Sequence, residues 1–201
     1  MRTYRPVSLN ILWFLIALNV IIFAATVIVG PYPIPPLDPF ANPIIRIFGL
    51  STNTFSYQPW TIITTMFVHG SFFHLLGNMI SLFFLGRFLL QLVGEGRFLL
   101  VYFLGGILGN ALFLLLEPGS IGIGASGGVY AIGGALMMIA PKLKVFIIPI
   151  PIAIPLWIAI LIFLAISFVP GIAWQVHLGG LLFGVGAGYY FKKKERIYFS
   201  R

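Results

Sequence analysis

"IGIGASGGVYAIGG", residues 121–134, decides the fold, because apolar residues and glycine make up almost all of it. Small residues of this kind let helices approach closely inside a membrane. One polar side chain, Ser126, stands near its centre between small neighbours. The stretch therefore raises the question of whether Ser126 only fills space between helices or whether the glycines expose its hydroxyl.

The composition of the chain is that of an integral membrane protein. Hydrophobic residues make up 60% of the 201 residues and charged residues only 8%, whereas about a quarter of the residues of a soluble domain are charged. The first apolar run, 9–29, has about the 20 residues of a full membrane span and exceeds a signal-peptide core. The chain has no cysteine, which excludes disulfides, thiol catalysis and thiolate metal sites.

Six apolar windows predict one all-α domain over residues 1–201 with six transmembrane helices and no soluble domain. A proline-rich but apolar segment, 30–60, separates the first two windows, and we expect it to lie at the outer membrane interface. The predicted spans are 9–29, 72–90, 97–116, 126–140, 153–169 and 173–191.

The basic residues predict the orientation of these spans. Six spans place both termini on one side, and that side collects eleven of the twelve Lys and Arg, with only Arg46 opposite. Because basic loops stay inside, the termini are predicted to be cytoplasmic in a multi-pass protein of the plasma membrane. The net charge of +8 then reflects topology and contact of the tail with anionic lipid, and we expect no nucleic-acid partner.

The few polar residues of the spans converge at one depth. His74 and Asn78 are four residues apart near the outer end of the second span and share a face. Ser126 begins the fourth span, and His177 lies about one turn into the sixth, again from the outer end. About 16 residues, or about 24 Å of helix, separate Ser126 from the lysines after its span. In a core about 30 Å thick, Ser126 then lies just below the outer surface, where irregular backbone requires a water-filled cavity.

Glycines spaced by four residues in the sixth span, from Gly180 onward, predict close packing against the glycine-rich fourth span. Such packing would bring His177 within hydrogen-bond reach of Ser126, which is the minimal arrangement of a base and an activated nucleophile. His74, Asn78 and the backbone N–H of Ser126 could then stabilise an oxyanion.

Support for the histidine is expected from an aromatic ring. Tyr130 lies one turn after Ser126 on the same face, where its ring could stack on the imidazole of His177. Glu117 is on the same side of the membrane, but nothing in its spacing places it behind His177, and a solvated loop charge is the simpler interpretation. The sequence therefore predicts a Ser–His dyad without a carboxylate.

Three motifs in the predicted order and orientation resemble the rhomboid family of intramembrane serine proteases, over nearly the whole chain: "HLLGN" from His74, "GASG" around Ser126 and "HLGGLLFG" from His177. The resemblance implies a cofactor-free and metal-free serine endopeptidase that cleaves single-pass membrane proteins near the extracytoplasmic face. It implies Ser126 as nucleophile, His177 as base, and His74 and Asn78 as oxyanion donors. Supporting roles fall to Tyr130, Gly124 and Gly180, and His69 matches a structural histidine.

The chain departs from the family pattern in the first loop and near the end of the second span. Thr61 follows Trp60 where many bacterial members have an arginine, and Leu90 stands where a glutamate is common. These changes leave open how the first loop is anchored. Three prolines, Pro149, Pro151 and Pro155, predict an extended start to the fifth span, whose loose packing suggests a lateral gate for substrate helices.

Other interpretations remain. Taken singly, Ser126 is more simply a small packing residue, His74 an interfacial histidine and Asn78 a donor of a hydrogen bond between helices. A catalytically inactive rhomboid-like protein that binds transmembrane clients is the main alternative. A small transporter is another, but it predicts polar residues that continue to the cytoplasmic side, where the spans are nearly bare of them. The motif His-Glu-x-x-His and intramembrane aspartates, which other intramembrane proteases need, are absent from the sequence.

Overall fold

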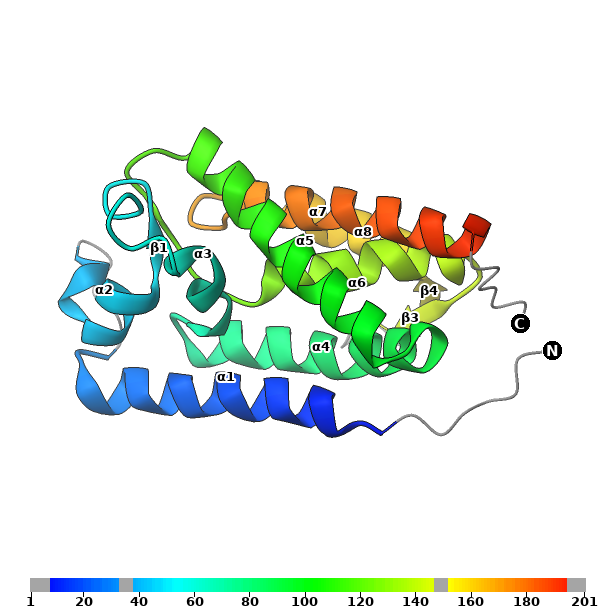
Figure 1. Ribbon diagram of the computed structural model, residues 1–201, viewed down its shortest axis with the longest axis horizontal. Helices are drawn as coiled ribbons and strands as arrows, with labels where there is room; N and C mark the ends of the chain where they lie inside the picture. The colour runs from blue at the N-terminus through cyan, green and yellow to red at the C-terminus, as the bar shows by residue number, and fades with distance from the viewer. Residues whose placement is uncertain (1–7, 33–37, 147–151, 195–201) are drawn as a thin grey trace.

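The computed structural model describes residues 8–32, 38–146 and 152–194 and is an all-α bundle (Figure 1). Its α-helices are α1 (Asn10–Val29), α2 (Pro43–Phe48), α3 (Thr61–Thr64), α4 (Phe72–Val93), α5 (Glu95–Leu116), α6 (Ser126–Ile139), α7 (Leu156–Ile166) and α8 (Trp174–Lys194). Two 3₁₀ turns, η1 (Pro39–Ala41) and η2 (Thr65–Phe67), accompany them. Short antiparallel pairs join β1 (Leu50–Ser51) to β2 (Ile121–Gly122), and β3 (Lys144–Phe146) to β4 (Ala153–Pro155).

The six longest helices lie where the sequence predicts six spans. The largest difference is in the fifth, which becomes helical only at Leu156, because 153–155 are extended and paired with β3. The extended start is thus confirmed as far as Pro155, whereas Pro149 and Pro151 lie outside the described residues. The helices α1, α4 and α5 are each long and apolar enough to cross a membrane, and α6 and α7 are shorter apolar helices. A count of six spans and their orientation stay predictions.

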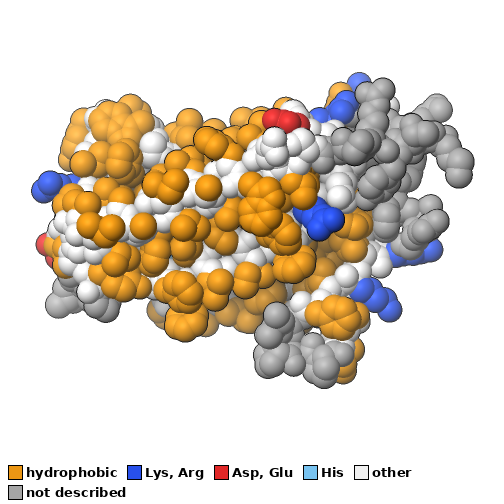
Figure 2. Space-filling model, turned by 90° about the horizontal axis from the view of Figure 1, so that it is seen from below, with side chains coloured by type: hydrophobic (Ala, Val, Ile, Leu, Met, Phe, Trp, Pro, Cys, Tyr) orange, Lys and Arg blue, Asp and Glu red, His pale blue; other side chains and the backbone are white. Residues whose placement is uncertain are grey.

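The outer surface of the bundle is apolar, as contact with lipid requires. Figure 2 shows a face on which hydrophobic side chains cover most of the middle, with charged side chains towards the ends. Large apolar side chains project from the helices, including Ile28 on α1 and Phe73 on α4, each 81% exposed. In water, an apolar surface this continuous would be an aggregation hazard; in a bilayer it is the surface expected.

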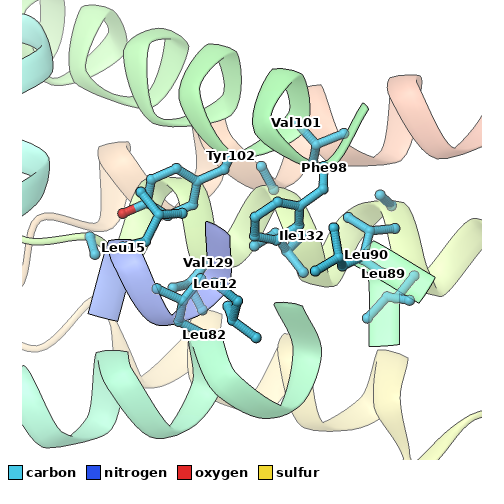
Figure 3. Close-up of a cluster of buried hydrophobic side chains, with 14 of the residues drawn as sticks. Leu12, Leu15, Leu82, Leu89, Leu90, Phe98, Val101, Tyr102, Val129 and Ile132 are labelled. Carbon is cyan, nitrogen blue, oxygen red and sulfur yellow. The ribbon is translucent and has the colours of Figure 1, made fainter. Parts of the chain in front are cut away.

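The interior between α1, α4, α5 and α6 is filled by aliphatic and aromatic side chains (Figure 3). Leu12 and Leu15 of α1 meet Leu82 of α4 and Tyr102 of α5, and all four are completely or almost completely buried. Truncation of one such buried side chain lowers the stability of a fold by about 2–5 kcal/mol. This cluster therefore fixes the positions of the helices that carry the polar residues.

Local chemistry defines where α4 begins and ends. The hydroxyl of Ser71 accepts a hydrogen bond from the backbone N–H of His74 at 3.2 Å and so caps the helix. At the other end Gly94 has a φ of 83° and turns the chain directly into α5. The cap at Ser71 therefore positions His74 in the first turn of α4.

The long segment between α1 and α4 forms one end of the bundle, opposite the start of α1 and the end of α8 (Figure 1). Side-chain bonds to backbone carbonyls anchor it. The amide of Asn42 donates to Thr26 at 2.9 Å, and the indole N–H of Trp60 donates to Ile47 at 2.9 Å. The loop is thus held by neutral hydrogen bonds, which answers how it is anchored without the arginine that many bacterial rhomboids carry.

Thr65 ties this loop to the segment that precedes α6. Its hydroxyl donates to the carbonyl of Gly122, and its carbonyl accepts from the N–H of Gly124 at 3.0 Å. The β1–β2 pair, with Leu50 opposite Gly122, holds the same segment. Irregular backbone just before Ser126 is therefore hydrogen-bonded, as a membrane environment requires.

Glycines on α8 allow its backbone to lie directly on α6. A Cβ added at Gly180, Gly184 or Gly188 would collide with backbone atoms of α6. The spacing of four residues is the same on both helices, so the two run together over about two turns. The facing residues on α6 are Gly127, Ala131 and Ala135. We call this contact the glycine seam.

The glycine seam predicts a sharp contrast between two alanine substitutions on α8. Gly184→Ala should lower stability by about 1–3 kcal/mol, because its methyl meets immovable backbone. Gly186→Ala is the matched control: a Cβ there meets nothing within 4 Å, and alanine is the better helix former. Thermal unfolding in detergent, followed by circular dichroism, measures both. Equal midpoints for the two variants would contradict a seam that depends on the missing side chain.

Candidate active site

Ser126 is the first residue of α6 and stands at the end of the segment that Thr65 holds. Before it, Gly124 has a φ of 124°, a conformation that residues with a side chain rarely adopt. A Cβ at Gly124 would lie 2.7 Å from Nε2 of His74 and 3.8 Å from Oγ of Ser126. Glycine is therefore required here for two reasons, its backbone conformation and the close approach of His74 to the serine.

The glycine seam brings α8 to Ser126. Nε2 of His177 lies 2.8 Å from Oγ of Ser126, at good hydrogen-bond distance. Both side chains are half-buried, so the pair is partly open to its surroundings. A base at this distance can take the hydroxyl proton as the oxygen attacks an electrophile.

Tyr130 stacks on the histidine, as its spacing from Ser126 predicts. The two ring centroids are 4.4 Å apart and the ring planes are inclined by 19°. The stack restricts rotation of the imidazole and covers one of its faces. The tyrosine thereby keeps the imidazole in the orientation that directs its Nε2 at Ser126.

His74 lies on α4 next to Gly124, two residues before Ser126, and Asn78 follows His74 one turn later on the same helix. Nε2 of His74 approaches Gly124, next to Ser126. The amide nitrogen of Asn78 donates to the carbonyl of His74 at 2.9 Å, and since an amide nitrogen carries two hydrogens, one bond leaves a second N–H to offer. His74 therefore lies close to Ser126, and Asn78 is hydrogen-bonded to the backbone of His74. A joint role of both side chains in stabilising an oxyanion stays a prediction.

His69 lies behind this group and is completely buried. Its ring packs edge-on against His74 with centroids 4.9 Å apart. Burial, with a smaller effect of the adjacent His74, lowers the pKa of His69 to about 3, so the ring is neutral at neutral pH. His69 therefore supports the position of His74, which agrees with the structural role implied by the resemblance.

Glu117 does not support His177. One carboxylate oxygen accepts from the amide of Gln175 at 2.6 Å, and the other accepts from the hydroxyl of Ser120 at 3.2 Å. The interpretation of Glu117 as a purely solvated loop charge is also wrong, because it holds the loop before Ser126 to the start of α8.

The structure places an unpredicted side chain next to the histidine. Oγ of Ser167, just after α7, lies 2.7 Å from Nδ1 of His177. The predicted Ser–His dyad therefore omits a side chain that is hydrogen-bonded to the far nitrogen of the histidine. One signal was available in the sequence: Ser167 is the only hydroxyl-bearing residue between 153 and 169. Spacing alone could not show that it faces the histidine, because Ser167 follows α7 whereas His177 lies on α8.

Comparison with known proteins agrees with this geometry. A family model described as the Rhomboid domain matches residues 56–194. The chain belongs to the rhomboid family. The predicted family is thus confirmed, and with it a membrane protein of rhomboid type.

Individual rhomboid relatives cover different shares of the chain. Over 194 residues it is 27% identical to Rhomboid-like protease 3 of Toxoplasma gondii, and the aligned region covers 92% of this chain and 70% of that protein. Over 136 residues it is 31% identical to RHOMBOID-like protein 1 of Arabidopsis thaliana, and the aligned region covers 67% of this chain but only 35% of that protein. A further relative, 31% identical over 110 residues, is the Inactive RHOMBOID-like protein 8 of the same plant. Family membership alone therefore does not establish catalysis.

Residues able to hold a metal ion do not gather in the described part of the chain: no three His, Asp or Glu side chains come together there. Among the described residues, the candidate site contains no side chain with a permanent charge, and its histidines are charged only when protonated. The chemistry that this arrangement supports is acyl transfer to a serine whose hydroxyl is hydrogen-bonded to an imidazole.

The role of Gly124 can be separated from its backbone conformation by a matched pair. Gly119 also has a positive φ, 83°, but a Cβ there meets nothing within 4 Å. Both Gly124→Ala and Gly119→Ala strain the backbone because both positions have a positive φ, by about 1–2 kcal/mol or more. Only Gly124→Ala also displaces His74, so its thermal midpoint in detergent should fall further. If the two midpoints fall equally, His74 does not depend on the absent side chain.

Proposed function

We propose that this rhomboid protein is an intramembrane serine endopeptidase that cleaves transmembrane segments of single-pass membrane proteins near the extracytoplasmic face. The observation that carries the proposal is the 2.8 Å contact between Nε2 of His177 and Oγ of Ser126. The ring of Tyr130 stacked on His177, and the close approach of His74 to Gly124, support it. The proposal places the protein in the plasma membrane as a multi-pass enzyme that contacts lipid and requires no cofactor.

The reaction follows from the positions of these groups. Nε2 of His177 takes the hydroxyl proton as Oγ of Ser126 attacks the carbonyl carbon of the scissile peptide bond. The negative charge that develops on the carbonyl oxygen is stabilised by His74, Asn78 and the N–H of Ser126. His177 then gives its proton to the leaving amine, and the acyl group remains on Ser126 as an ester. Water, activated by the same imidazole, hydrolyses the ester and restores the hydroxyl.

The main alternative is a rhomboid protein that binds transmembrane clients without cleaving them. One relative is named an inactive rhomboid-like protein, so the family includes members whose names indicate no catalysis. The hydrogen bond between Ser126 and His177 favours the protease, because client binding alone does not require it. A protein that retains a transmembrane client but never cleaves it would support the alternative.

Cleavage of a model substrate tests the proposed function. Purified protein, reconstituted with a single-pass substrate that has small residues near the outer end of its span, should cleave it. Ser126→Ala and His177→Ala should each lower the rate at least about a thousandfold, since removal of either member disables the pair. Unchanged thermal midpoints would show that both variants are folded. Equal cleavage by wild type and the alanine variants, or none by any, would contradict the proposal.

Substrate entry is proposed to occur between α4 and α7. The side chains of Leu85 on α4 and Ile160 on α7 both reach the space above Gly133 of α6, where a Cβ would lie 4.0 Å from the first and 2.7 Å from the second. The outer surface of α7 is exposed, including Trp157 at 45%. A substrate helix could enter here only if these two helices separate.

A reversible cross-link tests this gate. Because the chain has no cysteine, Leu85→Cys and Ile160→Cys can be joined selectively by a short thiol cross-linker that contains a reducible disulfide. The cross-linked protein should lose cleavage of a transmembrane substrate, and reduction of the same sample should restore it. Full cleavage in the cross-linked state would place the entry route elsewhere.

A further inference from the structure

Ser167 lies on the opposite side of the imidazole from Ser126. Its side chain is 2% exposed, and its Oγ has three polar neighbours. These are Nδ1 of His177 at 2.7 Å, the carbonyl oxygen of Phe163 at 2.8 Å and the hydroxyl of Tyr130 at 3.4 Å. A buried hydroxyl with three neighbours has its hydrogen-bonding capacity fully used.

Counting hydrogens assigns the direction of each bond. A serine hydroxyl has one proton to donate and two lone pairs that accept. The carbonyl of Phe163 can only accept, so the proton of Ser167 is used there. Oγ must therefore accept from the other two groups: from N–H at Nδ1 of His177, and from the hydroxyl of Tyr130.

This assignment fixes the tautomer of the histidine. With a hydrogen on Nδ1, the neutral imidazole has its lone pair on Nε2. That lone pair faces Oγ of Ser126 at 2.8 Å, which is the arrangement required to take the hydroxyl proton. The opposite tautomer would place an N–H against Ser126 and leave no base there.

We propose that Ser167 is a positioning residue that, with no charge of its own, holds His177 in the Nδ1–H tautomer and directs Nε2 at Ser126. Its effect on the rate rests on the proposed protease function, whereas its effect on the tautomer does not. In a Ser-His-Asp triad a carboxylate accepts the same N–H. A carboxylate buried at membrane depth is costly to desolvate, and a hydroxyl supplies the acceptor without that cost.

The variants can be matched closely in shape. Ser167→Ala removes the acceptor. Ser167→Thr keeps a hydroxyl that can bond the carbonyl four residues earlier, as threonine does in helices. Ser167→Val has the shape of threonine without the hydroxyl. A lower cleavage rate in Ser167→Val, with a retained rate in Ser167→Thr, therefore separates the effect of the hydroxyl from that of packing. Thermal midpoints in detergent check that each variant is folded.

The kinetic test separates positioning from substrate binding. Cleavage by Ser167→Ala and Ser167→Val should show a kcat about five- to tenfold lower, the rate equivalent of one neutral hydrogen bond. KM should stay within about twofold, because Ser167 contacts the histidine and not the substrate. Ser167→Thr should keep most of the wild-type kcat. A kcat within twofold of wild type in the Ala variant, or a changed KM at constant kcat, would overturn the role in the reaction.

A spectroscopic test needs no activity. Protein with ¹⁵N-labelled histidine rings reports by NMR which ring nitrogen carries the hydrogen, and His177→Ala assigns the signals. Wild type should show His177 with hydrogen on Nδ1, and Ser167→Ala a mixture of tautomers. Hydrogen on Nε2 in wild type, or an unchanged tautomer in Ser167→Ala, would overturn the inference. If wild type does not cleave, the proposed function fails while this measurement still decides the tautomer.

Discussion

The close approach of α6 and α8 is the contact on which the rest of the structure depends. Hydrophobic burial does not drive helix association inside a bilayer, because lipid tails are as apolar as the side chains, so helices associate by close packing and hydrogen bonds. Gly180 and Gly184 lack the side chains that would separate the two backbones. Without this seam, Ser126 and His177 would sit on helices too far apart for a hydrogen bond.

The candidate site is built without a carboxylate. A base that must take a proton needs its tautomer and orientation fixed, and soluble serine proteases do this with a buried aspartate. Here Tyr130 stacks on one face of the His177 ring, and Ser167 accepts from its far nitrogen. These three side chains, together with Ser126, form one chain of neutral hydrogen bonds and ring contacts. Such a chain keeps polar groups satisfied at a depth where an unpaired charge is costly.

The sequence predicts much of this because helix periodicity and glycine spacing are local properties. The helix positions, the seam, the meeting of Ser126 with His177 and the stacking of Tyr130 follow from residues three, four or seven apart. The contacts of Ser167 with His177 and of Thr65 with the segment before Ser126 were missed, because no glycine row or shared helix face marks them. No spacing rule reveals which residue of a neighbouring segment faces a given group.

The central claim is that His177 makes Ser126 reactive. Mass spectrometry of the intact protein after incubation with a fluorophosphonate, which phosphonylates activated serines, tests it most directly. The account predicts a single adduct that peptide mapping locates at Ser126, and no adduct in His177→Ala at the same exposure. An unmodified wild-type protein, an adduct at another serine, or equal labelling of His177→Ala would contradict it.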